Sequence, residues 1–411
     1  MRDRRPLSRA AGLAAVLVAA LLLSGCWGVA SMEKTGLVAL LGIDVAPGGA
    51  YRVTAAIIDP LGLPTPAGGS PESTPELLRS AEGGSTAEAI RKLSGSTYLN
   101  LDFTHMKGII VSTQVARMGL APALEFLTRN PLFLETPWVY VAHGETAASI
   151  LTESQHMTPD AGEVLTGTTA WAQHLFPSYA ARLFTLLDRM QTVGDEPATA
   201  GVSVDTTQGK GPTLAFRMTG TAVFRADRLM GWLDGRQTLG WLVATGRAKQ
   251  QTFVAPASGG GVFILQVLRT RRRVRITSGG AGPEADIRVN VKLSLVATQR
   301  APADFWSNPS ASRMLRTSAA DTLTGDISSA LRAAQSLGAD IFSLGEYVRV
   351  QDPAAWSKMR AQWDASSFGR MPVSIHVRVD ITTLGKKFCP MSPSDTRPVA
   401  VGCPPGMVPG A

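Results

Sequence analysis

The stretch that decides the fold class is VSIHVRVDI, residues 373–381. Valine and isoleucine occupy every second position, and serine, histidine, arginine and aspartate stand between them. Because successive side chains of a strand point to opposite faces, this alternation predicts a strand with one apolar face and one face open to water. The alternation recurs in Val262–Ile276 and Ile287–Leu295. The last third of the chain is therefore predicted to contain a sheet that is buried on one side only.

A long amphipathic helix is predicted upstream of this strand, after Asn308-Pro309. Its apolar positions recur at spacings of four and three and so form one stripe, made of Leu315, Ala319, Leu323, Ile327, Leu331, Ala334 and Leu337. A helix of about 28 residues is about 42 Å long. Because a stripe of this length needs an extended cover, we expect the helix to lie along the sheet. Residues 262–385 are therefore predicted as a C-terminal α+β domain, in which an antiparallel sheet packs on the long helix.

The first half of the chain alternates between predicted strands and helices. Two apolar runs, Gly36–Val45 and Tyr51–Ile58, flank Pro47-Gly48-Gly49, which predicts an antiparallel hairpin. A helix is predicted to begin at Ser85, because its spacing to Glu88 matches a capping box. Residues 26–200 are therefore predicted as an N-terminal α/β domain with a helical extension.

A middle domain of a β-hairpin and a helix is predicted for residues 201–261. Its strands are Thr221–Phe224 and Leu229–Leu233, and its helix follows Asp234-Gly235. The predicted fold class is α+β, with three mixed α/β domains. Residues 386–411 are proline-rich and are predicted to be a disordered tail.

The first 25 residues are typical of an export signal. Arginines at positions 2, 4, 5 and 9 precede an uncharged apolar run from Ala10 to Leu23. At about 14 residues the run is too short to span a bilayer, which takes about 20, but it fits a secretory signal. It ends in Leu23-Ser24-Gly25-Cys26, which resembles the lipobox of bacterial lipoproteins. Cys26 is therefore predicted to carry a diacylglycerol on its sulfur and to begin the mature chain.

Two alternatives stay open for this leader. One is an ordinary signal peptide with an incidental cysteine, and the other is a twin-arginine signal at Arg4-Arg5. Removal of residues 1–25 takes away four arginines and one aspartate, which lowers the net charge from +8 to +5. The rest of the chain has no apolar run of 18 residues, so the mature protein is predicted to be tethered to a membrane without spanning it.

Composition excludes several classes of protein. A hydrophobic share of 45% and a charged share of 18% exclude global disorder. Three cysteines exclude a disulfide-dense scaffold, and five scattered histidines argue against a metal cage. There is no G-x-S-x-G elbow, and the Gly209-Lys210-Gly211 sequence lacks the Ser or Thr of a phosphate-binding loop. We therefore predict no catalytic residue, no metal ligand, no noncovalent cofactor and no enzyme activity.

Seven segments that follow one another in the chain carry a family resemblance, together with Cys26-Trp27. They are GLVALLGIDVAPGGAYRVTAAIIDP, EGGSTAEAIRKLS, TYLNLDFTHMKGIIV, LAPALEFLTRNPLFLETPWVYVAHGE, GTAVFRADRLMGWLDGRQTLGWL, ADIFSLGEYVRVQDPAAWSKMRAQWD and VSIHVRVDI. In this order they resemble the Ger(x)C family, the C-subunit lipoproteins of spore nutrient germinant receptors. The resemblance covers roughly residues 20–385. It departs from the family at Gly28-Val29-Ala30, where members usually have an acidic residue and a basic stretch.

The resemblance implies a non-enzymatic receptor component with a three-domain α+β fold. It implies a place on the outer face of the spore inner membrane, held by lipid on Cys26. It also implies two integral-membrane partners, an A-type and a B-type subunit, and a part in sensing small nutrients. The alternative function is a solute-binding lipoprotein of a membrane transporter, which would need two lobes around a cleft.

The densest run of charge is made of Arg269, Arg271, Arg272, Arg273 and Arg275. One interpretation is a solvated strand and turn, with the arginines on the open face. Another is contact with anionic lipid headgroups, worth about 1 kcal/mol per residue near the surface, or with an acidic partner. Binding to nucleic acid is not expected, because the run has no interleaved aromatic residues.

Three further groups of residues have competing interpretations. Asp44 and Asp59 end neighbouring strands, and turn formation or capping is favoured over an acid–base pair. The tryptophans at 232, 241, 306, 356 and 363 are expected to pack in a core rather than to stack on sugars. Cys389 and Cys403 lie in the tail, and either a disulfide or two free thiols fits the sequence.

Overall fold

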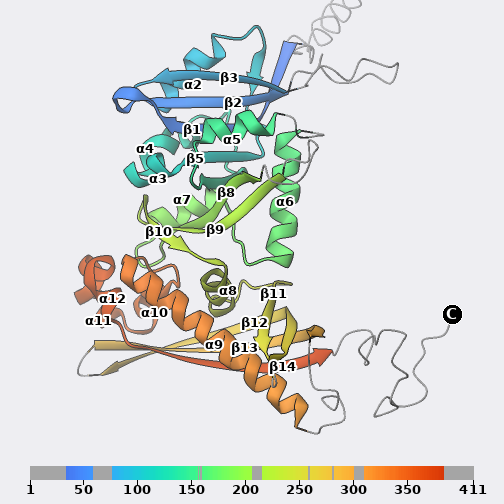
Figure 1. Ribbon diagram of the computed structural model, residues 1–411. Helices are drawn as coiled ribbons and strands as arrows, with labels where there is room; N and C mark the ends of the chain where they lie inside the picture. The colour runs from blue at the N-terminus through green and yellow to red at the C-terminus, as the bar shows by residue number, and fades with distance from the viewer. Residues whose placement is uncertain are drawn as a thin grey trace, which may run out of the picture.

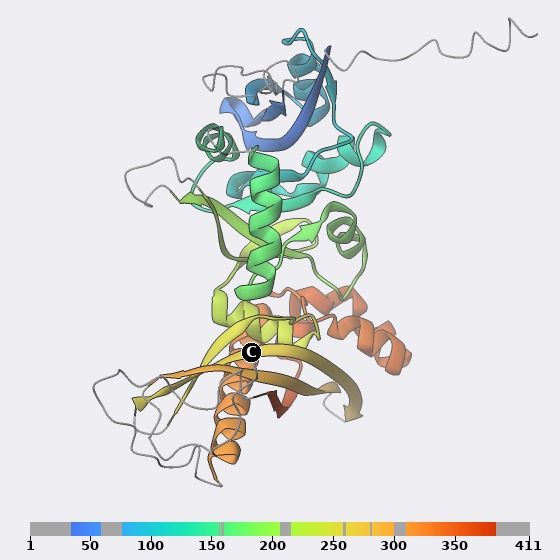
Figure 2. The same ribbon diagram turned by 90° about the vertical axis from the view of Figure 1, so that its right-hand side faces the viewer.

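The computed structural model describes residues 34–58, 76–155, 157, 160–205, 215–257, 260–279, 282–299 and 310–383. The molecule is elongated, with a large sheet toward one end and a small sheet at the other (Figure 1; Figure 2). The predicted signal peptide, Cys26, Asp59, Trp306 and the tail with Cys389 and Cys403 lie outside the described residues.

The large sheet has the strand order β10-β9-β8-β6-β5-β1-β2-β3, with β4 beside β1 and β7 beside β6. The strands are β1 (Thr35–Val45), β2 (Tyr51–Ile58), β3 (Glu76–Gly83), β4 (Asn100–Asp102), β5 (Gly108–Ser112), β6 (Trp138–Ala142), β7 (Ala181–Arg182), β8 (Ala198–Asp205), β9 (Ala215–Arg225) and β10 (Arg228–Leu233). The predicted hairpin is confirmed, because β1 and β2 pair antiparallel around the short helix η2 (Pro47–Gly49). The central strands β1, β5, β6 and β8 are parallel.

Helices cover both faces of the large sheet. They are α2 (Thr86–Ser94), α3 (Thr113–Met118), α4 (Leu120–Arg129), α5 (Ala147–Ser154), α6 (Ala161–Leu175) and α7 (Leu183–Gln191). One core lies between the sheet and α2, α3, α4 and α7, and the other lies between the sheet and α5 and α6. The predicted helix start at Ser85 is confirmed, because its side chain accepts from the Glu88 N–H at 3.2 Å. In a capping box the Glu88 carboxylate would accept from the Ser85 N–H, but here it accepts from the Gly84 N–H. The second hydrogen bond of the capping box is therefore displaced by one residue.

The small sheet contains β11 (Thr252–Pro256), β12 (Val262–Gly279), β13 (Gly282–Gln299) and β14 (Val373–Thr383), in that order. Its helices and turns are α8 (Gly235–Ala244), α9 (Ala311–Leu337), α10 (Leu344–Gln351), α11 (Pro353–Met359), η6 (Arg360–Gln362), η7 (Trp363–Ser367) and α12 (Phe368–Arg370). The predicted stripe is confirmed, because six of its seven members, all but Leu337, are buried on α9. The α+β fold class is confirmed.

The pairing of the last strand corrects one expectation. The C-terminal sheet was predicted to be antiparallel, but β14 runs parallel to β13, with Val289 opposite Val377. A parallel pair needs a long crossover connection, and the chain from β13 to β14 supplies one through α9 to α12. Alternation along a strand reports which face is buried, but it does not report the direction of the neighbouring strand.

Residues 201–261, expected as a middle domain, are divided between the two sheets. Their strands β9 and β10 extend the large sheet, whereas β11 extends the small one. The expected turn is present between β9 and β10, and Asp234 caps α8 with a full capping box. The division of the chain into three domains stays a prediction.

Candidate functional site

The arginine run lies on β12, and the structure divides it between the two faces of the small sheet. Arg269, Arg271, Arg273 and Arg275 are exposed on the open face, away from α9. A register shift between Val267 and Arg269 leaves Leu268 unpaired. The bulge puts Arg269 on the open face although Val267, two residues earlier, is buried. The ordinary alternation of a strand then keeps Arg271, Arg273 and Arg275 on that open face. The fifth member, Arg272, points to the covered face.

Three strands contribute charge to this open face. We call the basic face the set of seven exposed cationic side chains on β12, β13 and β14: Arg269, Arg271, Arg273, Arg275, Arg288, Lys292 and Arg378. Glu284, Asp286 and Asp380 are the acidic side chains on the same side of the sheet. The surplus of four positive charges makes this side of the sheet attractive to anions.

Most cations of the basic face have no partner within the described part of the chain. Asp286 binds Arg288 at 2.8 Å and lies 3.6 Å from His376. The other six cations make no side-chain hydrogen bond or ion pair to a described residue. Arg273 stands directly opposite Arg288 in the β12–β13 ladder. Like charges in opposite positions destabilise a sheet, so this pair costs local stability, whereas Arg275 opposite Asp286 and Lys292 opposite Asp380 are favourable cross-strand pairs.

Apolar side chains are exposed at the β11 end of the same sheet. Val254, Leu268 and Val296 are each between 42% and 55% exposed. Val254 pairs with Ile264, and Leu268 and Val296 are the extra residues at the two register shifts of the β12–β13 ladder. The sheet therefore has an exposed apolar end beside its basic face.

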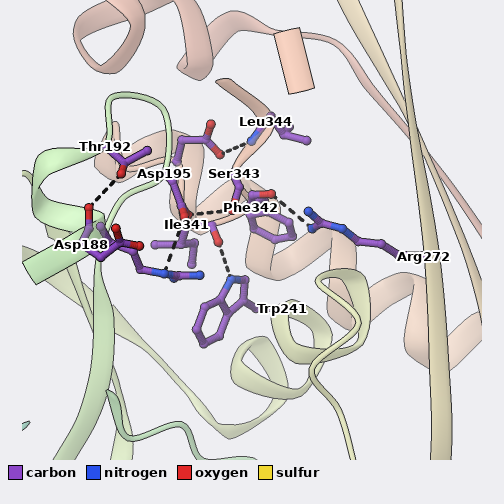
Figure 3. Close-up of polar contacts among 11 residues, drawn as sticks. Asp188, Thr192, Asp195, Trp241, Arg272, Ile341, Phe342, Ser343 and Leu344 are labelled. Carbon is purple, nitrogen blue, oxygen red and sulfur yellow. Dashed lines mark hydrogen bonds and ion pairs between the residues drawn. The ribbon is translucent and has the colours of Figure 1, made fainter. Parts of the chain in front are cut away.

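Arg272 has an intramolecular role. Its guanidinium donates to the Tyr347 hydroxyl at 2.9 Å. It also donates to the Phe342 carbonyl at 3.3 Å (Figure 3). The guanidinium carbon also lies 4.8 Å from the centre of the Tyr347 ring. These contacts tie β12 to the segment that leads into α10, so Arg272 is not part of the basic face.

A second polar cluster joins the two ends of the molecule. The Ser343 hydroxyl donates to Asp195 at 2.6 Å (Figure 3). Arg189 lies 3.6 Å from the same carboxylate. Asp340 is fully buried and accepts from the N–H groups of Leu344 and Gly345. Burial raises the pKa of Asp340 to about 7, although these hydrogen bonds act in the opposite direction.

We call this contact between the two ends of the molecule the junction. Two more carboxyl groups, those of Glu196 and Asp364, belong to it. Burial, reinforced by the negative charge of Asp364, raises the pKa of Glu196 to about 8. Burial also raises the pKa of Asp364, against the effect of Arg225. The Glu196 N–H donates to the Asp340 carbonyl at 3.0 Å, and the Ala226 N–H donates to the Glu196 carboxyl group. The junction therefore holds protons near neutral pH, and sequence reasoning missed it because its residues come from distant segments.

The other predicted side chains have structural roles. Asp44 accepts from the N–H groups of Ala147 and Ala148 at 2.8 Å, so it caps α5 as the capping interpretation expected. Trp356 and Trp363 are buried with their ring centres 5.3 Å apart, and Trp241 donates to the Ile341 carbonyl. Within the described ranges no group of three His, Cys, Asp or Glu side chains is placed to hold a metal. None of the described helices is both long enough and apolar enough to cross a bilayer.

Comparisons with known proteins match both halves of the chain. Residues 29–204 match the spore germination protein N-terminal domain. Residues 219–385 match the family described as spore germination B3/GerAC like, C-terminal. The chain belongs to the Ger(x)C family. The predicted family resemblance is thereby confirmed, and with it a role in spore germination.

Individual relatives of this Ger(x)C chain agree with the assignment. Spore germination protein KC of Bacillus subtilis (strain 168) is 24% identical over 397 residues, which cover 92% of this chain and 96% of that protein. Putative spore germination protein YfkR of the same organism is 28% identical over 243 residues, which cover 58% of this chain and 62% of that protein. The crystal structure of the GerBC protein matches the fold with a TM-score of 0.50 and 15% identity, over 83% of this chain and 96% of that one.

Proposed function

We propose that this Ger(x)C chain is the lipid-anchored, non-catalytic C subunit of a spore nutrient germinant receptor. The family match over residues 29–204 and 219–385 is the observation that carries the proposal. The sequence around Cys26 supports the anchor.

The anchor explains how such a subunit would find its partners. Two acyl chains hold a protein on a membrane far more firmly than one, since each buried CH₂ contributes about 0.8 kcal/mol. A tether on Cys26 restricts the chain to a thin layer at the outer face of the spore inner membrane. Its effective concentration around integral-membrane A-type and B-type subunits rises without any new contact. Assembly and signalling within that receptor are the function that this placement suits.

The alternative, a solute-binding lipoprotein, requires an open cleft between two lobes. At the junction between the two ends of this molecule, the backbone of Gly194 meets that of Gly345. A Cβ built on Gly194 would lie 2.8 Å from the Gly345 Cα and 3.1 Å from the Trp356 ring. This close packing favours the receptor-subunit proposal.

The test is the anchor variant Cys26→Ala, expressed in spores in place of the natural chain. We expect the chain to move from the membrane pellet to the soluble fraction. Nutrient-triggered germination should fall at least 10-fold, and germination by agents that bypass receptors should be unchanged. Cys403→Ala is the matched control and should leave both readouts unchanged. An unmodified Cys26 in mass spectra, or a normal nutrient response after deletion of the gene in a strain without a paralogue, contradicts the proposal.

A further inference from the structure

We infer that the open side of the four-stranded sheet, with its basic face and its apolar end, is a docking surface for a carboxylate-rich protein partner. This inference rests on the proposed function, because it assigns the surface through which the chain would contact a neighbouring subunit. It extends the original arginine run by cations from β13 and β14, and it excludes Arg272.

The charges of the basic face are arranged for a partner outside the chain. Alternate residues of a strand lie about 6.7 Å apart, and neighbouring strands lie about 4.8 Å apart, so β12, β13 and β14 present a lattice of cations. Six of the seven cations are arginines. A guanidinium binds a carboxylate through two parallel hydrogen bonds, and arginine is enriched in protein interfaces where lysine is depleted. The lattice therefore matches a surface of aspartate and glutamate side chains.

The apolar end gives the surface a second interface property. Exposed Val254, Leu268 and Val296 adjoin the cations on the same sheet. An apolar patch beside polar residues is typical of an interaction surface. Apolar contact would stabilise a complex, and the cations would select an acidic partner and accelerate its association.

The position of the face favours a protein over the lipid surface. β1 begins at the end of the molecule opposite the small sheet (Figure 1; Figure 2). The nine residue steps from Cys26 to Thr35 span at most about 30 Å, so an anchored chain holds that first end near the membrane. The described residues of the open face also include no exposed tryptophan or tyrosine, the side chains that favour the lipid–water interface. The basic face therefore lies where another protein can reach it.

The experiment uses spores that carry the full chain with Arg271→Lys, Arg273→Lys and Arg275→Lys. These changes keep the charge and add primary amines, which a carbodiimide joins to carboxylates in direct contact. We expect mass spectrometry to map crosslinks from these three positions to Asp or Glu residues of an integral-membrane protein needed for the same nutrient response. The control carries lysine at three exposed arginines elsewhere, Arg117, Arg313 and Arg332, and should give at least 10-fold fewer crosslinks to that protein.

A charge-reversal arm makes the test decisive. Arg271→Glu, Arg273→Glu and Arg275→Glu together should abolish co-purification with the same membrane protein. The melting temperature should change by no more than about 2 °C, because the three side chains are exposed. The reversal at Arg117, Arg313 and Arg332 should leave co-purification unchanged. Absence of crosslinks from the face, or co-purification that survives its reversal, overturns the inference.

A lipid arm separates the alternative source of anionic charge. The full chain with Cys26→Ala is mixed with vesicles of phosphatidylcholine, with and without 30% phosphatidylglycerol. We expect no difference in sedimentation between them. Binding that requires phosphatidylglycerol and is lost on charge reversal would assign the face to lipid and overturn the inference. Failure of the proposed function is recognised separately, by an unmodified Cys26 or by a nutrient response that survives deletion, and neither readout involves the basic face.

Discussion

At the scale of the residue, two neighbours on β12 show how position in the pleat decides a role. Arg271 is exposed on the basic face and makes no side-chain hydrogen bond to a described residue. Arg272 donates to the Tyr347 hydroxyl and to the Phe342 carbonyl. The two side chains have the same chemistry, but only one of them contributes to the folded core.

This difference predicts opposite results for two alanine variants. Arg272→Ala should lower the free energy of unfolding by about 1–3 kcal/mol, because it removes charge-assisted hydrogen bonds to partly buried acceptors. Arg271→Ala should stay within about 0.5 kcal/mol of the natural chain. Urea denaturation followed by circular dichroism measures both values. Equal losses in the two variants would contradict the assignment of their faces.

At the scale of the element, the contact between α8 and α9 depends on a single small residue. A Cβ built on Gly240 would lie 2.3 Å from the backbone carbonyl of Asp326 on α9. Glycine is therefore required here for close approach of two helices, although it lowers helix propensity. This contact attaches α8 to the long helix and so connects the end of the large sheet to the small one.

Replacement of this glycine should be costly. Gly240→Ala must push α8 away from the α9 backbone, and we expect a loss of at least 2 kcal/mol in the free energy of unfolding. Gly235→Ala, at the start of the same helix, meets no atom within 4 Å. That control should be neutral or stabilising by up to about 1 kcal/mol, because alanine is the better helix former. Thermal denaturation of the two variants distinguishes local packing from helix propensity, and a stable Gly240→Ala protein would refute the packing argument.

At the scale of the whole molecule, the two ends meet at partly or fully buried carboxyl groups instead of at a purely apolar interface. Asp195 and Glu196 precede strand β8 of the large sheet. Asp340 lies in the connection between α9 and α10, and Asp364 lies in η7. Burial raises the pKa of all four groups. The proton balance of this junction therefore couples the stability of the molecule to pH.

The sign of this coupling follows from Glu196. In the unfolded chain its carboxyl group ionises near 4.5, whereas in the folded chain its pKa is about 8. Between these values the folded state binds more protons, so this group's contribution to stability is complete below about pH 4.5 and is lost as the pH rises toward 8. We expect the melting temperature to fall between pH 5.5 and 8.5.

Glu196→Gln should remove part of that pH dependence, because the amide keeps an acceptor for the Ala226 N–H without a charge near Asp364. The variant should be at least as stable as the natural chain at pH 8.5. Glu125→Gln, at an exposed position on α4, is the control and should leave the slope unchanged. A steeper fall in the Glu196→Gln variant would contradict the assignment.

Much of the fold could be predicted from local pattern. The predicted features include the stripe of α9, the alternation of β14, the β1–β2 hairpin, the helix start at Ser85 and the helix near Asp234-Gly235. All of them appear where the sequence places them. These features depend on residues within a few positions of one another, so the chain itself contains the information. The family resemblance, carried by segments in order, is of the same kind.

Tertiary structure alone decided which surfaces meet. Periodicity marks the buried face of an element but not the element that covers it, so the parallel pairing of β14 and the sharing of residues 201–261 between two sheets were not predictable. The same limit applied to Arg272 and to the carboxyl groups of the junction, whose partners are distant in sequence. Local sequence was enough to identify most of the helices and strands and the family, and it predicts the leader. The tertiary structure decided which arginine side chains are exposed and which carboxyl groups are buried. Both depend on contacts between segments that are far apart in the chain.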